Sequence, residues 1–116
     1  MKIYCDGSGF NGVESRVAAI CEDSSHHILT CFNAERTNNE MEYFAVINGL
    51  ILAEPGDEVL TDSQLVAFQL SGKYKVREPR MKPLYDCAKG ISELKKVPVK
   101  WIRGTTNMAH KLFKQR

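Results

Sequence analysis

The chain has 116 residues, and its hydrophobic content of 43% is enough for a buried core that needs no disulfide or metal support. Its apolar runs fall short of the roughly 20 residues of a membrane-spanning helix, and residues 1–12 lack the basic start and apolar stretch of a signal peptide. We therefore expect residues 1–116 to form one monomeric domain that lies in the cytoplasm and has no association with membranes.

Charge is unevenly distributed along the chain, although the formal net charge is only +2. Residues 1–72 contain eleven Asp and Glu against three Lys and Arg, a balance of −8. Residues 73–116 contain thirteen Lys and Arg against three acids, a balance of +10. This division suggests an acidic site in the first part and a polyanion-binding surface in the second. A solvated basic face without a partner is an equally good interpretation at this point.

Three strands and a helix are predicted in the first part of the chain. Apolar or β-branched runs separated by turn residues predict sequential strands over Lys2–Asp6, Arg16–Glu22 and His27–Phe32. From residue 38 to residue 53 apolar side chains recur at helical spacing, with Thr37 or Asn38 as the N-cap. The Glu-Pro-Gly sequence at 54–56 then ends the helix.

The rest of the chain alternates between strands and helices. Glu58–Thr61 predicts a fourth strand, and Asp62 or Ser63 can cap a helix that continues to Ser71. We further expect a helix at Lys82–Lys95, a strand at Val97–Arg103 and a short helix at Thr105–Lys114. An antiparallel meander followed by alternating helices and strands predicts an α/β layer with a mixed sheet.

Three acidic residues stand at the ends of the predicted elements. Asp6 ends the first strand, Glu42 lies in the first turns of the helix, and Asp62 follows the fourth strand. Taken singly, each has the ordinary explanation of a capping or turn residue. Strand ends beside a helix start are where α/β folds build their sites, so the three carboxylates are expected to converge. Clustered carboxylates need a compensating cation, and hard oxygen ligands suit Mg²⁺ or Mn²⁺, which points to metal-dependent phosphodiester chemistry.

Three motifs carry these acids, namely Asp6–Gly7–Ser8–Gly9, Thr37–Asn38–Asn39–Glu40–Met41–Glu42 and Thr61–Asp62–Ser63–Gln64. Further matching segments are Gly72–Arg77, Val99–Arg103 and Asn107–Leu112. In these motifs the chain resembles the type 1 ribonuclease H family over nearly its whole length. The resemblance implies a ribonuclease H-like α/β fold, in which helices flank a five-stranded mixed sheet of three antiparallel and then two parallel strands.

The same resemblance implies an endonuclease that hydrolyses the RNA strand of RNA/DNA hybrids with two Mg²⁺ or Mn²⁺ ions and leaves 5′-phosphate and 3′-hydroxyl ends. In the family four acids hold the ions, and the motifs place three of them at Asp6, Glu42 and Asp62. Glu40 is the competing choice for the second acid. We prefer Glu42 because it keeps the family's offset from the Thr-Asn-Asn segment, whereas Glu40, two positions away on a helix, points elsewhere.

The fourth acid of the family falls at position 110, where this chain has His110. A histidine brings no negative charge and is a softer ligand than Mg²⁺ prefers, so the departure weighs against full activity. At a helix start, a neutral imidazole can still bind a metal ion or take a proton, which makes His110 a fourth metal-binding and catalytic candidate. An exposed histidine without a role is the alternative.

Substrate contacts are implied by the resemblance for two groups of residues. Polar side chains that face the minor groove of the hybrid and the RNA 2′-hydroxyls are expected at Ser8, Asn38, Asn39 and Gln64. Basic side chains that follow the phosphates are expected at Lys73, Lys75 and Arg77.

Two other functions stay open. A catalytically silent nucleic-acid-binding domain would keep the fold and bind hybrid without cutting it, which the histidine at position 110 motivates. A DNA nuclease or resolvase on the same fold is the second alternative. The positions of Asn38, Asn39 and Gln64 argue against the second alternative, because they match hybrid-cutting relatives.

Overall fold

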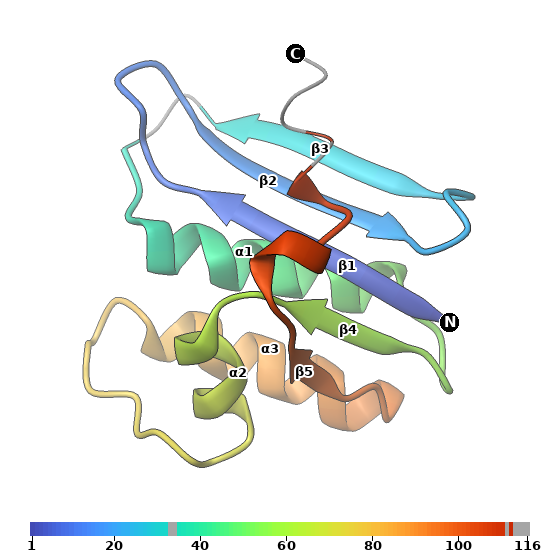
Figure 1. Ribbon diagram of the computed structural model, residues 1–116. Helices are drawn as coiled ribbons and strands as arrows, with labels where there is room; N and C mark the ends of the chain where they lie inside the picture. The colour runs from blue at the N-terminus through green and yellow to red at the C-terminus, as the bar shows by residue number, and fades with distance from the viewer. Residues whose placement is uncertain (33–34, 111, 113–116) are drawn as a thin grey trace.

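A five-stranded sheet forms the centre of the structure, a computed structural model that describes residues 1–32, 35–110 and 112 (Figure 1). The elements are β1 (Lys2–Ser8), β2 (Ser15–Cys21), β3 (His27–Phe32), α1 (Asn38–Leu52), β4 (Glu58–Thr61), α2 (Gln64–Leu70), α3 (Lys82–Lys95) and β5 (Val99–Trp101). The strand order is β3-β2-β1-β4-β5. The pairs β1–β2 and β2–β3 are antiparallel, whereas β1–β4 and β4–β5 are parallel. This confirms the predicted mixed sheet.

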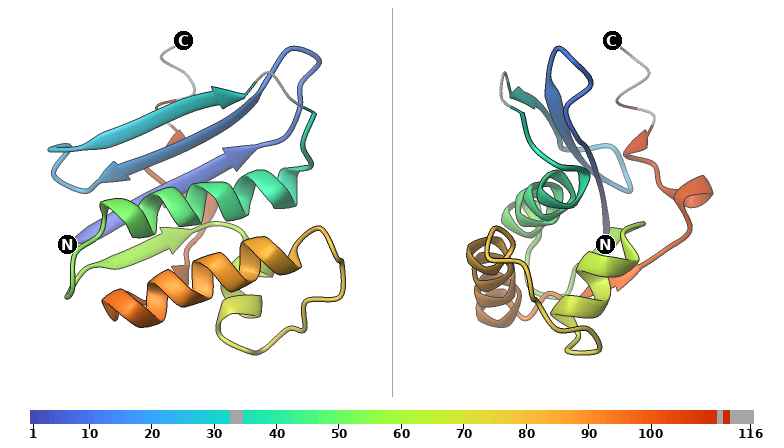
Figure 2. Two further views of the ribbon diagram at one scale, coloured as in Figure 1. Left: turned by 180° about the vertical axis from the view of Figure 1, so that it is seen from behind. Right: turned by 90° about the vertical axis from the view of Figure 1, so that its left-hand side faces the viewer.

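The long helices and the C-terminal segment lie on opposite faces of the sheet. Figure 2 shows α1 and α3 side by side across one face, and the segment after β5 crossing the other. The core between these helices and the sheet includes the fully buried side chains of Ile3, Val17, Met41, Val46, Leu50 and Val59. Burying each such side chain stabilises the fold by about 1.5–3 kcal/mol. Within the described part of the chain, no helix has the length and apolar character needed to cross a bilayer.

Helix α1 is held at both ends. Thr37 is its N-cap: the Thr37 Oγ1 atom accepts from Glu40 N at 3.2 Å, and the Glu40 carboxylate accepts from Thr37 N at 3.1 Å. At the other end, the Lys95 ammonium of α3 donates at 2.9 to 3.0 Å to the backbone carbonyls of Leu50, Ile51 and Ala53. Because carbonyls at a helix end lack partners within the helix, these bonds fix the end of α1 against α3.

The C-terminal segment differs from the prediction of one helix over Thr105–Lys114. The structure has a 3-10 turn at Gly104–Thr106 and then an extended residue, Asn107, with φ −85° and ψ 108°. The Asn107 side chain explains the break, because its Nδ2 atom donates to the Cys5 carbonyl at 2.9 Å and ties the segment to β1. Residues 111, 113 and 114 of the expected helix lie outside the described residues.

Candidate active site

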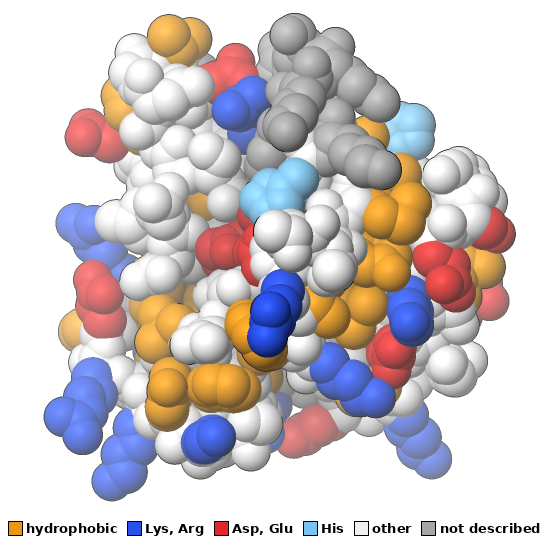
Figure 3. Space-filling view, viewed as in Figure 1, with side chains coloured by type: hydrophobic (Ala, Val, Ile, Leu, Met, Phe, Trp, Pro, Cys, Tyr) orange, Lys and Arg blue, Asp and Glu red, His pale blue; other side chains and the backbone are white. Residues whose placement is uncertain are grey.

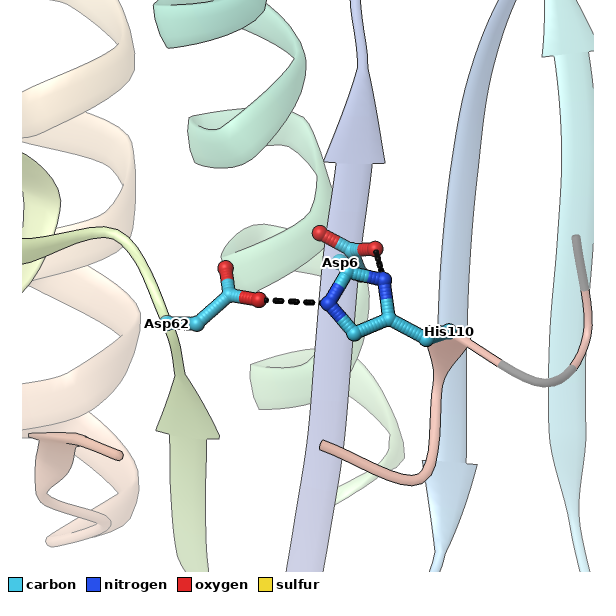
Figure 4. A group of neighbouring side chains, drawn as sticks. All are labelled: Asp6, Asp62 and His110. Carbon is cyan, nitrogen blue, oxygen red and sulfur yellow. Dashed lines mark hydrogen bonds and ion pairs between the residues drawn. The ribbon is translucent and has the colours of Figure 1, made fainter. Parts of the chain in front are cut away.

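The carboxyl ends of β1 and β4 bring two of the predicted acids together. Parallel pairing matches Cys5 with Thr61, so the residues that follow them, Asp6 and Asp62, lie side by side. Only 6% of the Asp6 side chain and 14% of the Asp62 side chain are exposed. The strand pairing therefore holds two carboxylates close together with little water around them (Figure 4).

Glu42 reaches the same place because α1 approaches β1 at a glycine. A Cβ atom on Gly7 would collide with the backbone carbonyl of Met41, so a larger residue would push the helix away. The Glu42 Oε1 atom accepts a hydrogen bond from Gly7 N at 2.6 Å. The Glu42 carboxylate interacts with both aspartates, and the three residues Asp6, Glu42 and Asp62 are called the acid cluster below.

Glu40, the competing candidate, has a different environment. Its carboxylate accepts from Thr37 N at 3.1 Å and lies 3.5 Å from Arg36 Nη1. Only 5% of Glu40 is exposed, so this carboxylate is committed to the start of α1. The structure thus brings Glu42, and not Glu40, to the two aspartates.

His110 lies between the two aspartates. Its Nδ1 atom is 2.7 Å from Asp6 Oδ2, and its Nε2 atom is 2.9 Å from Asp62 Oδ2, so one ring bridges both carboxylates (Figure 4). A doubly protonated imidazolium can donate from both nitrogens, whereas the neutral ring can donate from only one. When it carries both protons, the imidazole therefore supplies the cationic partner that the crowded carboxylates need.

Burial and mutual repulsion disfavour the charged forms of two acids. Burial, followed by the charges of Asp6 and Asp62, raises the pKa of Glu42 to about 9. Burial and the charge of Asp62 likewise raise the pKa of Asp6 to about 6, while His110 opposes that rise. A bound cation would offset the repulsion between these carboxylates and favour their ionised forms.

The donor atoms at this site fit a divalent cation. One ligand atom each from Asp6, Asp62 and His110 lies within 4.8 Å of the others. Two of the three donors are hard carboxylate oxygens, and the third is an imidazole nitrogen, which Mn²⁺ accepts more readily than Mg²⁺ does. Glu42, which interacts with both aspartates, adds a further carboxylate beside this group.

Metal-free protein is expected to lose stability as the pH rises from 4.5 towards 9. Across this interval Glu42, with its ordinary pKa of 4.5 raised to about 9, keeps in the folded state a proton that it loses on unfolding. Each rise in pH therefore favours the unfolded state. Thermal unfolding in EDTA across this interval tests the effect, with Glu42→Gln as the comparison. The variant should show a flatter pH dependence, and parallel curves for the two proteins would contradict the assignment.

An open pocket of about 370 Å³ lies beside Asp6, Glu42 and His110. Its lining comprises Asp6, Gly7, Ser8, Asn38, Asn39, Glu42, Ser63 and His110. Three of the predicted substrate contacts, Ser8, Asn38 and Asn39, thus lie beside the acids. Gln64 is exposed in the first turn of α2 and is not part of this lining.

The predicted phosphate contacts are separate from the pocket. Lys73, Lys75 and Arg77 are all exposed on the segment that connects α2 to α3. Figure 3 shows Lys and Arg side chains spread over the lower half of the face, among Asp and Glu side chains, with further acidic side chains near the centre of the face. The face that carries the acidic site therefore also carries exposed basic side chains.

Three residues to which the sequence reasoning assigns no role shape the site. Gly104 leaves room for the bridge, since an added Cβ atom would lie 3.3 Å from Asp62 Oδ2 and 3.5 Å from His110 Nε2. Trp101 Nε1 donates to the Asp62 carbonyl at 3.1 Å. Asn107, only 4% exposed, holds the segment that delivers His110. Trp101 and Asn107 lie in the segments Val99–Arg103 and Asn107–Leu112 that match the family's pattern, which was the available signal for them, whereas no such signal pointed to Gly104.

A family model described as RNase H matches residues 1–111. The chain belongs to the ribonuclease H family. The match includes all three residues of the acid cluster and position 110, where this ribonuclease H family member has a histidine. The resemblance inferred from the motifs is thereby confirmed.

Known relatives and structures agree with this membership. The bifunctional protein Rv2228c of Mycobacterium tuberculosis is 36% identical over 76 residues, which are 61% of this chain. The chain spans only 21% of the length of the curated relatives it matches. The solved N-terminal RNase H domain of Rv2228c, fused to maltose binding protein, has a TM-score of 0.81 at 25% identity, with 98% of this chain and 93% of that chain covered.

Two further solved structures are similar. LC11-RNase H1 in complex with an RNA/DNA hybrid has a TM-score of 0.81 at 26% identity, covering 96% of this chain and 91% of that chain. RNase H1 from the halophilic archaeon Halobacterium salinarum NRC-1 has a TM-score of 0.76 at 21% identity, covering 99% and 98%, and shares the fold. These matches confirm the predicted ribonuclease H-like fold.

Proposed function

We propose that this ribonuclease H family member hydrolyses the RNA strand of RNA/DNA hybrids. The observation that carries the proposal is the convergence of Asp6, Glu42 and Asp62 from two strand ends and a helix start. The family match supports a nuclease, and the similarity to LC11-RNase H1, solved with an RNA/DNA hybrid, supports this substrate.

Asp6, Glu42, Asp62 and His110 would hold two divalent ions, Mg²⁺ or Mn²⁺. Bound there, such ions supply a Lewis acid for the scissile phosphate and an activated water, so that the products would carry 5′-phosphate and 3′-hydroxyl ends. The chain itself holds the ligands in place: strand pairing fixes the two aspartates, and the Gly7 N–H fixes the Glu42 carboxylate. Partial exclusion of water from these carboxylates strengthens their attraction for cations.

The lining of the pocket suits an RNA strand. The Asn38 Oδ1 atom accepts from Gly9 N at 2.6 Å, which turns the amide so that its NH₂ group can donate to a 2′-hydroxyl. Asn39, Ser8 and Gln64 would add contacts along the minor groove. Such contacts distinguish RNA from DNA without reading base sequence. The basic residues Lys73, Lys75 and Arg77 would bind backbone phosphates.

The test is incubation with end-labelled RNA/DNA hybrid, double-stranded DNA and double-stranded RNA, each with Mg²⁺ and then with Mn²⁺. We expect cleavage of the RNA strand of the hybrid alone, with 5′-phosphate ends on the products. Cutting of double-stranded DNA would favour a DNA nuclease on the same fold.

A silent nucleic-acid-binding domain is the second candidate, favoured by the histidine at position 110. It predicts tight binding of hybrid without cleavage in either metal. Metal binding can be followed separately through Trp101, the one tryptophan of the chain, because its indole donates to the Asp62 carbonyl. An emission change with metal but no cleavage of any substrate would support this second candidate.

His110 is expected to make Mn²⁺ the better metal. An imidazole in place of a carboxylate leaves less negative charge for two cations, and Mn²⁺ tolerates nitrogen ligands better than Mg²⁺ does. His110→Asp should shift the preference towards Mg²⁺. His110→Ala should lower the rate in both metals by about tenfold or more, since losing a group around a metal weakens its binding by that order.

The measurement is the initial cleavage rate across a titration of each metal, together with Trp101 emission. His27→Ala serves as a matched control, because His27 is exposed on β3 at the edge of the sheet. If His110→Ala keeps the rates and the metal preference of the unmodified protein, His110 takes no part in the site.

A further inference from the structure

The segment Gly72–Arg77, called the basic segment below, has a fixed course although it forms no helix or strand. It begins with a turn at Gly72, whose φ of 85° suits glycine. Tyr74 N then donates to the Phe68 carbonyl at 3.0 Å, and the Tyr74 and Phe68 rings meet edge to face at 5.2 Å. Val76 packs against the core. The exposed basic side chains of the segment are therefore carried on an anchored backbone.

Two buried side chains connect this segment to α1. The Tyr43 hydroxyl donates to Gln69 Oε1, and the Gln69 Nε2 atom donates to the Lys75 carbonyl at 3.5 Å. Tyr43 is fully buried, and Gln69 is 5% exposed. A buried amide needs partners for both its ends, so the Tyr43 hydroxyl sets which way the Gln69 amide points.

We propose that Tyr43 and Gln69 are positioning residues that set where the basic segment lies relative to the acid cluster. Tyr43 directly follows Glu42, and consecutive helical residues project about 100° apart. One turn of α1 thus directs the Glu42 carboxylate to the acid cluster and the Tyr43 hydroxyl to the two hydrogen bonds that lead through Gln69 to the Lys75 carbonyl. This inference rests on the proposed function, since it assumes that Lys73, Lys75 and Arg77 bind phosphates of the hybrid.

The hydroxyl of Tyr43 is separable from its ring. The ring fills core volume, which phenylalanine would fill equally, whereas only the hydroxyl can donate to Gln69. Without it, the buried Gln69 oxygen loses its donor, and the amide is expected to turn away from Lys75. The basic segment would then keep its charges but lose its fixed distance from the acid cluster.

The experiment compares Tyr43→Phe and Gln69→Met with the unmodified protein. Hybrid affinity is measured over a salt series in an Asp62→Asn background, so that the hybrid stays uncut, and KM and kcat are measured without that background change. We expect Kd and KM to rise roughly three- to tenfold, the free-energy equivalent of one hydrogen bond. The slope of log Kd against log salt should become shallower, while kcat and the metal titration of Trp101 stay within about twofold. The double variant should bind no more weakly than Gln69→Met alone, because both act through one chain of contacts.

Two further variants separate positioning from other effects. Ser92→Ala removes a hydroxyl that donates to the Val97 carbonyl at 2.6 Å, near the end of α3. It should cost stability without changing Kd or the salt slope. The triple variant with Gln in place of Lys73, Lys75 and Arg77 gives the reference value for loss of all three phosphate contacts. Its slope of log Kd against log salt should be shallower by about one unit for each lost contact.

Unchanged Kd and salt slope in Tyr43→Phe and Gln69→Met would overturn the proposal. So would a fall in kcat with unchanged Kd, since Tyr43 would then act through Glu42. An unchanged slope in the triple variant would remove the phosphate contacts and the positioning proposal with them. Failure of the proposed function looks different, because the unmodified protein would then leave the hybrid uncut while the binding differences persist.

Discussion

Asp6→Asn and Asp62→Asn are each expected to lower the rate of hybrid cleavage by about three orders of magnitude. An amide lacks the charge that holds a divalent cation, and a metal ion stabilises a phosphoryl transition state by several kcal/mol. Each loss of about 1.4 kcal/mol of that stabilisation lowers the rate tenfold. Both carboxylates are largely buried and lie side by side, so neither can replace the other. Single-turnover cleavage of labelled hybrid measures the loss.

Stability provides the control for these two variants. Each removes one charge from a crowded cluster in which the pKa of Asp6 and the pKa of Glu42 are both raised. Thermal unfolding in EDTA should therefore show a fold as stable as the unmodified protein or more stable. Near-normal cleavage by either variant would remove the metal-site assignment.

Glu42→Gln is expected to lower kcat by about two orders of magnitude, whereas Glu40→Gln should leave it within about twofold. The Glu42 carboxylate contacts Gly7 N and interacts with the aspartates, while that of Glu40 contacts Thr37 and Arg36. Glutamine can replace glutamate in a capping box, so Glu40→Gln loses only a partly exposed ion pair worth about 1 kcal/mol or less.

Parallel rate and melting measurements on both variants decide the point. A larger loss of kcat in Glu40→Gln than in Glu42→Gln would mean that α1 presents a different face to the acids. Equal and small losses would place the second acid of the site outside α1.

The closeness of Asp6 and Asp62 was predictable because neighbouring parallel strands can place the residues at their ends in only a few arrangements. Asp6 and Asp62 directly follow Cys5 and Thr61, the last pair of the parallel ladder between β1 and β4, so both acids come to the same edge, although β1 itself continues to Ser8 beyond the predicted end at Asp6. The choice between Glu42 and Glu40 came from the resemblance, because Glu42 keeps the family's offset from the Thr-Asn-Asn segment, while helical geometry says only that the two carboxylates point in different directions. The meander and the alternating helices were enough to predict a mixed α/β sheet, because they allow few sheet orders. The five-stranded ribonuclease H-like arrangement came from the family resemblance.

Features that depend on one side chain's partner were not predictable. The expected C-terminal helix is interrupted because Asn107 uses its amide to bind the Cys5 carbonyl, a contact across 102 positions. The strand predicted from Val97 begins at Val99, after Pro98, whose ring nitrogen cannot donate to a sheet, and this boundary, in contrast, could have been read from the sequence. The bridge from His110 to both aspartates depends on that same path of the segment.

The contact at Gly7 makes the acid cluster sensitive to the seating of a whole helix. There the backbone of α1 contacts the backbone of β1 directly, with no side chain between them. A side chain could change rotamer when the helix moves, whereas two backbones in contact cannot adjust in this way. A shift of α1 would therefore also move the Glu42 carboxylate, even when the shift is caused by a change in side-chain volume on the opposite side of the helix. The spacing of the acid cluster in this protein therefore depends on how the hydrophobic core packs.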